Sequence, residues 1–389
     1  MRNTTPPDPV AAARALAPRI RAHAEENEAA RRLAPAVAEA LSAAGLFQMC
    51  VPRRFGGGEV APGVMVRAIE AVAESDGSAG WCVMIAATTG VIAAYLPEAI
   101  AEQVYGGPGR PVSGGVFAPH GTARVDDGAY VVSGQWPFAS GCQHCTWLMG
   151  GAVIVDETGP RRLPNGMPDA RMLLFPACDV EIVDTWAVSG LRGTGSHDIR
   201  VANLRVPADR SVSLMVDSPR QAGALYVFPV FGLLAMGIAG VSLGIARQAI
   251  GELTALAAGK TPTGSRRKLA ERPLVQMQVA QADAAVRASR AFLYDTIEET
   301  WAAARAEGRI SLQQRAMLRL AATHATSSAA TAVDLMYSAG GGTSIYARSP
   351  LQRCFRDIHV ATQHLMVASP TYEVVGRVLL GLETDTAQL

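Results

Sequence analysis

The chain has 389 residues, of which 49% are hydrophobic and 18% are charged, and its formal net charge is +1 at pH 7. A chain of this length is expected to form about two to three domains, and its apolar content is enough for a large buried core. The near-neutral charge and the absence of a long basic run argue against nucleic acid as a partner. No hydrophobic signal region is visible at the N-terminus, and six cysteines in a chain this long do not indicate a disulfide framework.

Two uncharged segments, 77–97 and 221–246, are long enough to cross a bilayer. Both contain closely spaced Gly, Ala and Ser residues, and neither is flanked by a cluster of Lys and Arg. Such segments are typical of helices that are packed on all sides in a soluble bundle. We therefore expect core helices, no membrane partner and a cytoplasmic location, with the thiols reduced.

The composition and hydrophobic periodicity of the chain change twice along its length. Ala, Arg, Glu and Leu with helical periodicity fill residues 1–110, where Asp76 is expected to begin a helix that carries Trp81 on its apolar face. Short β-like runs separated by turn residues fill 111–215. Long helical patterns return in 216–389, where Ser369-Pro370 is expected to start the last helix. The fold class is therefore α+β, with an N-terminal helical domain, a middle β domain and a C-terminal bundle of four helices.

The stretch 134–147 (Gly-Gln-Trp-Pro-Phe-Ala-Ser-Gly-Cys-Gln-His-Cys-Thr-Trp) concentrates aromatic and small polar residues between two apolar runs. A tight bend of this kind offers aromatic faces and hydrogen-bonding groups to a flat, partly polar ring. A β-hairpin with aromatic core residues would have the same composition. Cys142, Cys145 and the intervening His144 have no second pair at metal-ligand spacing, so no metal site is predicted.

Three segments together resemble the acyl-CoA dehydrogenase superfamily, in the order of the family and over nearly the whole chain. Residues 134–147 resemble the Gly-x-Trp-x-Phe-x-Ser-Gly segment that touches the flavin ring in one branch. Residues 189–207 resemble the Gly-x-Arg-Gly-Thr-x-Ser strand pair that ends in Val-Pro, and residues 351–364 resemble the Arg-Asp segment that leads to the active site. The helical–β–helical order of the chain agrees with this resemblance.

The absence of two dehydrogenase features indicates which branch of the superfamily this sequence resembles. Dehydrogenases of this fold need a carboxylate that removes the α-proton of an acyl thioester. Neither usual position holds one here, because 363–366 reads Gln-His-Leu-Met and no acid lies between Asp217 and Glu252. The Arg-x-Phe-Gly motif that helps to hold FAD is also absent near 265–268. His364 instead resembles the histidine of the two-component flavin-dependent monooxygenases, which include 4-hydroxyphenylacetate and steroid-phenol hydroxylases and the dibenzothiophene oxygenase.

This resemblance implies a chemistry and a set of partners. Such oxygenases take reduced FMN or FAD from a separate NAD(P)H:flavin reductase, bind O2, and pass one oxygen atom to the substrate through a C4a-(hydro)peroxyflavin. An aromatic or related cyclic small molecule is the implied substrate, and a homotetramer is the implied assembly. An apolar cavity would keep water from the reactive flavin, which agrees with the apolar helices of the chain.

The resemblance also implies roles for individual residues. His364 would be the acid/base, and Ser140 with the neighbouring backbone would hold the N5 edge of the flavin. The flavin would also contact the residues Trp136, Phe138, Phe117, Gly341 and Gly342, the last two at a phosphate that could belong to a neighbouring subunit. His120 and Thr88 would line the substrate pocket.

The other histidines are assigned to structural roles. His359 lies five residues before His364, which on one continuous helix is about 140° away, so the two would not share a site. His144 is expected to pack, and His197 to be exposed. Without the family match, His364 itself would be interpreted as a core histidine.

Several alternatives stay open. The phenol hydroxylases often carry a histidine on the helix that reads 84–90 here, and this chain has none. A fused aromatic, a heteroaromatic, a polyketide or an activated thioester is therefore as open as a simple phenol. An acyl-CoA dehydrogenase with FAD and a relocated base is one alternative function, and a non-catalytic flavin- or acyl-binding protein is another.

Overall fold

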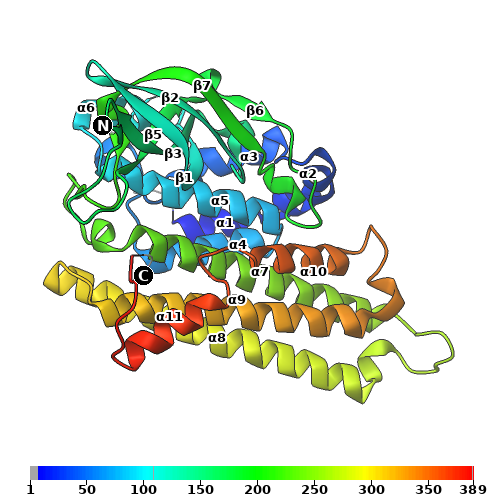
Figure 1. Cartoon of the computed structure of the whole chain (residues 1–389). Coiled ribbons are helices and arrows are strands. Elements are labelled where there is room, and N and C mark those ends of the chain that lie inside the picture. Colours follow the sequence, from blue (N-terminus) through cyan, green and yellow to red (C-terminus); the bar gives the residue numbers. More distant parts are fainter. Residues whose placement is uncertain (1–7, 108, 388) are drawn as a thin grey trace, which may run out of the picture.

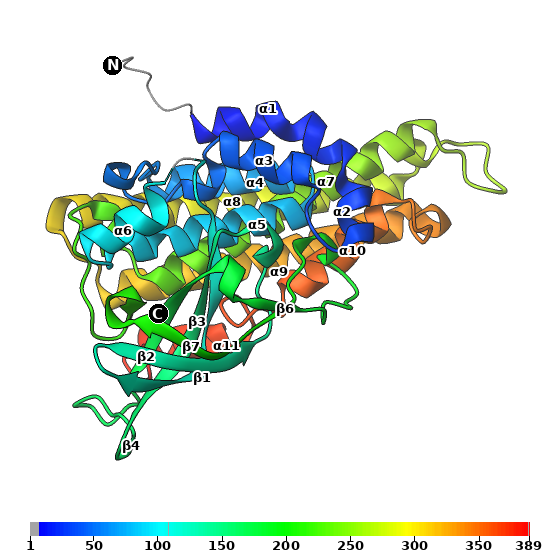
Figure 2. The ribbon, with the colours of Figure 1, turned by 90° about the horizontal axis from the view of Figure 1, so that it is seen from above.

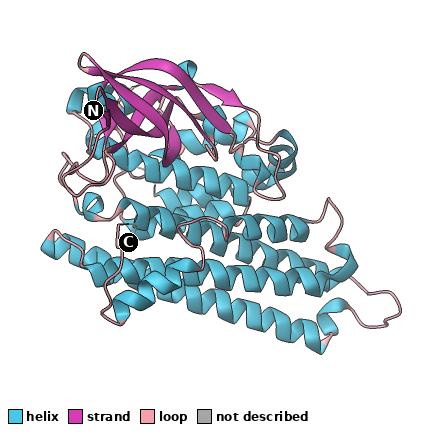
Figure 3. Ribbon diagram, viewed as in Figure 1, coloured by secondary structure: helices cyan, strands magenta, loops and turns pink. Residues whose placement is uncertain are grey.

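The computed structural model describes residues 8–107, 109–387 and 389, and it has the expected α+β architecture. One sheet lies over a layered body of helices, with the sheet at the top of Figure 1. Strands and helices occupy separate regions when they are coloured by type (Figure 3). The view from above shows the strands on one side of the helices (Figure 2). The predicted order of helices, strands and helices is confirmed.

In the described residues, six α-helices precede the sheet. They are α1 (Pro9–Ala22), α2 (Ala24–Ala30), α3 (Pro35–Ala43), α4 (Pro62–Ala73), α5 (Gly77–Thr89) and α6 (Glu98–Tyr105). The start of α5 is fixed by Asp76, whose carboxylate accepts the backbone N–H of Ser78 at 3.1 Å. This N-cap satisfies a backbone donor that the helix itself cannot pair, as the sequence predicted. It places Trp81 in the second turn of α5. This helix lies next to β1 of the sheet (Figure 1).

Over the described ranges 8–107, 109–387 and 389, the sheet has eight strands in the order β6-β7-β2-β1-β3-β5-β8, with β4 paired to β3. Strands β1 and β3 run parallel, and the other pairs are antiparallel. The strands are β1 (Ser113–Asp126), β2 (Ala129–Trp136), β3 (Trp147–Asp156), β4 (Gly159–Pro160), β5 (Ala170–Pro176), β6 (Glu181–Val183), β7 (Asp198–Pro207) and β8 (Ser211–Val212).

Trp136 is the centre of the sheet's own hydrophobic core. Its side chain is fully buried, and its indole N–H donates to the carbonyl of Gly151 at 2.7 Å. A Cβ atom built on Gly121, Gly134 or Gly150 would lie within 2.7 Å of the indole, so these positions must be glycine for the ring to fit. Trp136 therefore packs inside the sheet and has no surface free for a flavin, contrary to the expectation from its motif.

Five α-helices follow the sheet in the part of the chain that the structure describes. They are α7 (Val230–Gly259), α8 (Pro273–Glu307), α9 (Leu312–Gly340), α10 (Pro350–Ala361) and α11 (Pro370–Leu379). Helix α9 begins with a capping box in which Ser311 and Gln314 exchange side-chain and backbone hydrogen bonds. Helix α11 begins at Pro370 after Ser369 as predicted, although the Ser369 side chain makes no capping hydrogen bond.

The two helical parts of the chain share one hydrophobic core. Glycines of α7 bring it close to the earlier helices, because a Cβ at Gly237 would lie 2.5 Å from Met84 of α5, and a Cβ at Gly244 would lie 2.6 Å from Ala73 of α4. The helical parts thus form one body on which the sheet rests. The domain boundaries near 110 and 215 stay a prediction, since the outer segments are packed together.

In the described part of the chain, residues 77–94 and 230–259 are long and apolar enough to cross a membrane. The apolar windows of these segments are 94% and 89% buried inside the protein. They are the two core helices that the sequence predicted.

Candidate active site

Trp81 connects two of the predicted functional residues. Its indole N–H donates to the Ser140 hydroxyl at 3.1 Å, and its ring centroid lies 5.7 Å from that of the His364 imidazole, with the two planes tilted by 59°. Three distant segments meet here: helix α5, the loop after β2, and the turn after α10. The structure therefore brings Ser140 and His364 to the same corner, with the Trp81 ring in contact with both.

Ser140 is the first member of a chain of hydroxyl groups. Its Oγ lies 2.7 Å from Oγ of Ser196, which lies 2.6 Å from Oγ1 of Thr194. Thr194 Oγ1 in turn donates to the carbonyl of Leu191 at 2.8 Å. The second and third hydroxyls belong to the 189–207 motif, so two of the three matching segments are joined by direct hydrogen bonds.

The backbone N–H groups of the loop around Ser140 are hydrogen-bonded within the protein. The amide N–H groups of Ala139, Ser140, Gly141 and Cys142 donate to backbone carbonyls of the protein, at distances from 2.8 to 3.2 Å. Phe138 sits at φ +67°, a left-handed conformation that bulky residues rarely adopt. Its side chain is 68% exposed and meets the Trp186 ring edge-on at 6.1 Å. The loop therefore presents one hydroxyl and one exposed aromatic ring.

His364 lies in the turn that follows α10. Its Nδ1 accepts the backbone N–H of Met366 at 3.2 Å, which leaves the proton of the neutral ring on Nε2. Burial, and then the positive charge of Arg319, lower its pKa to about 4. His364 is therefore neutral at pH 7 and offers an Nε2–H donor to whatever binds beside it.

Arg319 of α9 anchors the segment that carries His364. This arginine is 3% exposed, and its Nε donates to the carbonyl of Met366 at 3.2 Å. A second guanidinium nitrogen lies 3.4 Å from Oγ1 of Thr371, and burial lowers the arginine pKa to about 10. A buried cation thus fixes the 364–371 segment and adds to the burial that keeps His364 unprotonated.

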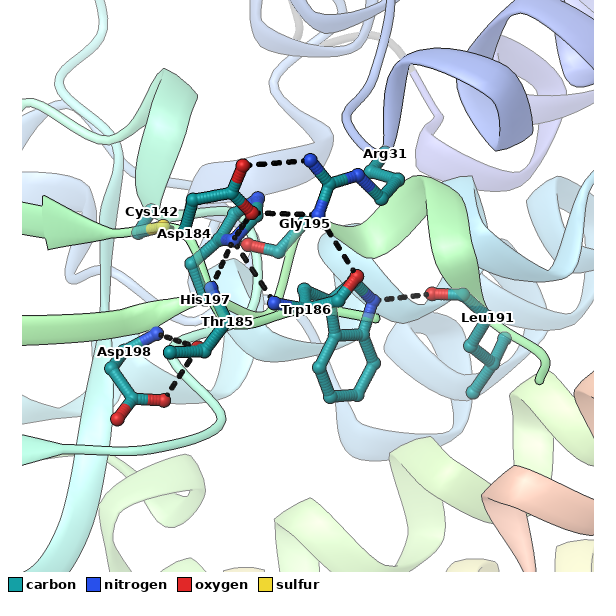
Figure 4. A network of polar contacts seen from close by, with 9 residues as sticks. All are labelled: Arg31, Cys142, Asp184, Thr185, Trp186, Leu191, Gly195, His197 and Asp198. Atoms are coloured by element: carbon teal, nitrogen blue, oxygen red, sulfur yellow. Dashed lines mark hydrogen bonds and ion pairs between the residues drawn. The ribbon is translucent and has the colours of Figure 1, made fainter. Parts of the chain in front are cut away.

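The motif after β6 forms a second polar network around His197 (Figure 4). Its Nδ1 accepts the backbone N–H groups of Thr185 and Trp186, at 3.3 and 3.2 Å. Burial lowers the pKa of His197, which is 3% exposed. The expected surface position was therefore wrong: the ring is neutral and holds the 184–186 segment in place.

The same network joins this segment to helix α2 and to the hydroxyl chain. Arg31 makes two hydrogen bonds of 2.6 and 2.8 Å to the Asp184 carboxylate and a longer one to the carbonyl of Trp186. The Trp186 indole donates to the Leu191 carbonyl at 3.2 Å (Figure 4). The same carbonyl oxygen accepts from the Thr194 hydroxyl. Through the Leu191 carbonyl, this network stabilises the loop that carries Thr194 and Ser196.

Among the described residues, three further predicted site residues make no hydrogen bond or ring contact with Ser140 or His364. Phe117 of β1 is half-buried and meets Phe231 of α7 edge-on at 6.0 Å, so it lies between the sheet and the helices. His120 is exposed at the register shift of β1. Thr88 of α5 is buried, and its hydroxyl donates to carbonyls of its own helix. Their roles in a flavin or substrate pocket stay predictions.

Gly341 and Gly342 lie at the far end of α10 from His364. The intervening α10 has 12 residues, which corresponds to a length of about 18 Å. Gly341 has φ +56°, and a Cβ on either glycine would meet nothing within 4 Å. Within one chain the structure therefore does not bring these glycines to the Ser140 corner, and the prediction of a phosphate contact is left for a neighbouring subunit.

His359 does not approach the corner either. Helix α10 ends at Ala361, so the predicted separation along one continuous helix does not apply. His359 instead pairs with Asp334 at 2.8 Å and packs against Phe355. His144 packs as expected: it stacks on Phe47 at 5.2 Å, and burial lowers its pKa to about 4.

The buried carboxylates of the described residues all serve the fold. Glu70 binds Arg290 and Tyr294, and Asp169 binds Arg161. Asp76 caps α5, and Asp357 accepts the backbone N–H of Leu191 at 2.6 Å. Each is committed to a structural partner, so none is free to serve as the relocated base of a dehydrogenase.

Sequence reasoning missed Trp81, Ser196 and Thr194 as members of the site. The Thr-x-Ser spacing of the motif was recognised, but nothing in one sequence says that its hydroxyls reach Ser140, 56 residues away. Trp81 could have been singled out, because a large ring with one polar atom stands among small residues in α5.

The comparisons with known proteins agree with this geometry. The family model of the acyl-CoA dehydrogenase N-terminal domain matches residues 10–107, and that of the C-terminal domain matches residues 236–369. Indole-3-acetate monooxygenase of Pseudomonas putida is 33% identical over 93% of this chain and 91% of its own length. The chain belongs to the acyl-CoA dehydrogenase family.

Its relatives place it among the oxygenases of that family. The flavin-dependent monooxygenase oxygenase subunit HsaA of Mycobacterium tuberculosis is 31% identical over 90% of this chain and 89% of its own length. A crystal structure of the HsaA monooxygenase from M. tuberculosis superposes with a TM-score of 0.90 at 26% identity, and the match covers 99% of this chain and 100% of the other. The chain is an oxidoreductase of the flavin-dependent monooxygenase branch, as its empty base positions and His364 predicted.

Proposed function

We propose that this chain is the oxygenase component of a two-component system that uses reduced FMN or FAD and O2 to oxygenate an aromatic or related cyclic small molecule. A separate NAD(P)H:flavin reductase would supply the flavin, and the working form would be a cytoplasmic homotetramer. The observation that carries the proposal is the corner in which Trp81 contacts both Ser140 and His364. The names of two relatives agree with it: HsaA is a flavin-dependent monooxygenase oxygenase subunit, and the Pseudomonas putida relative is an indole-3-acetate monooxygenase.

The groups at this corner fit the polar edge of a flavin. The Ser140 oxygen is buried and keeps an acceptor position for a flavin N–H group, while the Nε2–H donor of His364 is left for an oxygen of the other reactants. The exposed Phe138 ring provides an apolar surface on the same loop. A reduced flavin, when bound, supplies the electrons that activate O2.

The chain's own residues then have distinct tasks. Ser140 accepts a hydrogen bond from the ligand, and Trp81 fixes the orientation of that hydroxyl. His364, held neutral by burial and by Arg319, donates from Nε2 to an oxygen of the bound reactants. Trp81 and the apolar helices beneath it exclude water from the reacting atoms.

The test combines the purified chain with an unrelated flavin reductase, NADH, FMN or FAD, and a panel of indoles, phenols and fused heteroaromatics. Under isotopically heavy O2, one labelled oxygen atom in a product is the expected result. NADH consumption that yields only hydrogen peroxide with every compound would count against this substrate class. Reduction of bound flavin by an acyl-CoA without O2 would establish a dehydrogenase and overturn the proposal.

A further inference from the structure

The hydroxyl chain behind Ser140 is sealed from solvent. The residues Ser140, Ser196 and Thr194 are 5%, 3% and 2% exposed, and their oxygens are linked at 2.7 and 2.6 Å. The last link joins Thr194 Oγ1 to the Leu191 carbonyl at 2.8 Å. Because these hydroxyls are almost completely buried, bulk solvent cannot pair an oxygen that lacks a partner, so each oxygen–oxygen contact needs a proton of its own.

The protons of this chain can point in one direction only. Three hydroxyl protons serve three oxygen–oxygen contacts. A carbonyl cannot donate, so Thr194 donates to Leu191, Ser196 donates to Thr194, and Ser140 donates to Ser196. The reverse direction would leave the 2.8 Å contact between Thr194 and Leu191 without a proton, with two oxygen lone pairs facing each other.

Ser140 is therefore restricted toward a ligand. The Trp81 indole is a donor only and takes one of its lone pairs, and the Ser140 proton is used by Ser196. The backbone N–H groups of 139–142 are engaged within the protein. This loop offers a ligand one acceptor lone pair and no free hydrogen-bond donor.

We infer that the chain Thr194–Ser196–Ser140 makes this site select reduced flavin over oxidised flavin, an inference that rests on the proposed function. N5 carries a hydrogen in reduced flavin and only a lone pair in oxidised flavin. Ser140 would therefore accept a hydrogen bond from N5 of reduced flavin, whereas with oxidised flavin its lone pair would face another lone pair. Thr194 and Ser196 touch no ligand in this arrangement. They are positioning residues that set the redox preference by fixing the direction of the Ser140 hydroxyl proton.

The test measures the dissociation constants of oxidised and of anaerobically reduced FMN and FAD for the full chain and its variants. In Ser196→Ala the Ser140 hydroxyl is free to rotate and donate to oxidised N5. Because one neutral hydrogen bond is gained, the affinity for oxidised flavin should rise about tenfold, while that for reduced flavin stays nearly constant. Thr194→Val should act in the same direction, since Ser196 can then donate to Ser140.

Two matched variants separate this effect from a loss of packing. Thr194→Ser keeps the terminal proton and should retain the preference of the unmodified chain. Ser289→Ala removes an equally buried hydroxyl that is bonded within its own helix, and should leave both constants unchanged. Thermal unfolding confirms that each variant is folded.

The possible failures are distinguishable. If the unmodified chain binds neither redox form of FMN or FAD, the proposed function is wrong. If it binds flavin but Ser196→Ala and Thr194→Val, both folded, leave the ratio of the two constants unchanged, the hydroxyl chain does not set the preference and this inference is overturned.

Discussion

The Trp81 ring lies 5.7 Å from the His364 imidazole, centroid to centroid, although 283 positions of sequence separate the two residues. The contact joins α5 to the turn after α10. It depends on the glycines of α7 that let α5 approach the C-terminal helices, because a Cβ at Gly237 would strike Met84 one turn beyond Trp81. The geometry of the candidate site thus follows from the packing of the helical body.

His364 is predicted to act as a neutral hydrogen-bond donor. His364→Ala should lower product formation about a hundredfold at saturating reduced flavin, since general acid–base groups contribute at least that much. His364→Gln should retain part of the rate, because its amide N–H replaces Nε2–H. The dissociation constant of reduced flavin, measured beside the rate, should change little in both variants.

The pH dependence follows from the same residue. Because the pKa of His364 is lowered to about 4, the wild-type rate should stay level between about pH 6 and pH 8. A rate that titrates near the ordinary histidine pKa of 6.5, and loses that titration in His364→Gln, would contradict the neutral assignment.

His144 should make the protein less stable in mild acid. Its pKa is about 4 in the folded protein and 6.5 in the unfolded chain, so the unfolded chain binds more protons between these values. Stability is therefore present above pH 6.5 and is lost as the pH falls toward 4, by roughly 2 to 3 kcal/mol.

The measurement is chemical denaturation at several pH values. His144→Phe keeps a ring stacked on Phe47 but cannot titrate, so its stability should fall less steeply in acid than that of the wild type. His324→Phe, at an exposed ring that meets Phe292 edge-on, is the matched control and should follow the wild-type curve. Identical slopes for wild type and His144→Phe would disprove this account.

Asp357 is predicted to stabilise the folded protein through its hydrogen bond and not through its charge. Burial raises its pKa to about 7, and its Oδ1 accepts the Leu191 N–H at 2.6 Å. Asp357→Asn keeps an acceptor and should be tolerated. Asp357→Ala leaves a buried N–H without a partner and should cost about 2 kcal/mol of unfolding free energy.

The same pair of variants tests whether the 189–197 loop supports the site. Leu191 is the residue whose carbonyl ends the hydroxyl chain. Asp357→Ala should therefore also weaken the binding of reduced flavin, and Asp357→Asn should not. Equal unfolding free energies and equal affinities for the two variants would show that this hydrogen bond is unimportant.

An oligomer is expected to cover the apolar surface around α11. Leu379, Leu380 and Leu382 are 57%, 76% and 49% exposed on the single chain, and Leu365 is 61% exposed. The double variant Leu379→Glu/Leu380→Glu should lower the mass measured by light scattering below that of a tetramer. Val125→Glu, at a partly exposed position of the sheet, should leave the mass unchanged. A wild-type protein whose mass by light scattering is that of a monomer would contradict this prediction.

The sequence by itself determined the local elements and the branch of the family. Periodicity and turn residues decide them within a few positions, so the Asp76 cap, the start of α11 and the block of strands between 111 and 215 lie where they were predicted. The missing carboxylates and the presence of His364 are properties of composition at given positions, and they need no coordinates.

Tertiary structure alone decided which side chains share the site. Trp136 belongs to a flavin-contact motif, yet three glycines on neighbouring strands create the space that buries it. His197 lies in a turn, yet two backbone N–H groups and burial make it a neutral anchor. The direction of the hydroxyl chain depends on distances between residues of separate segments. The periodicity of a sequence shows which face of its own helix or strand a residue occupies. The contacts of that residue with other helices and strands are fixed only when those elements pack together.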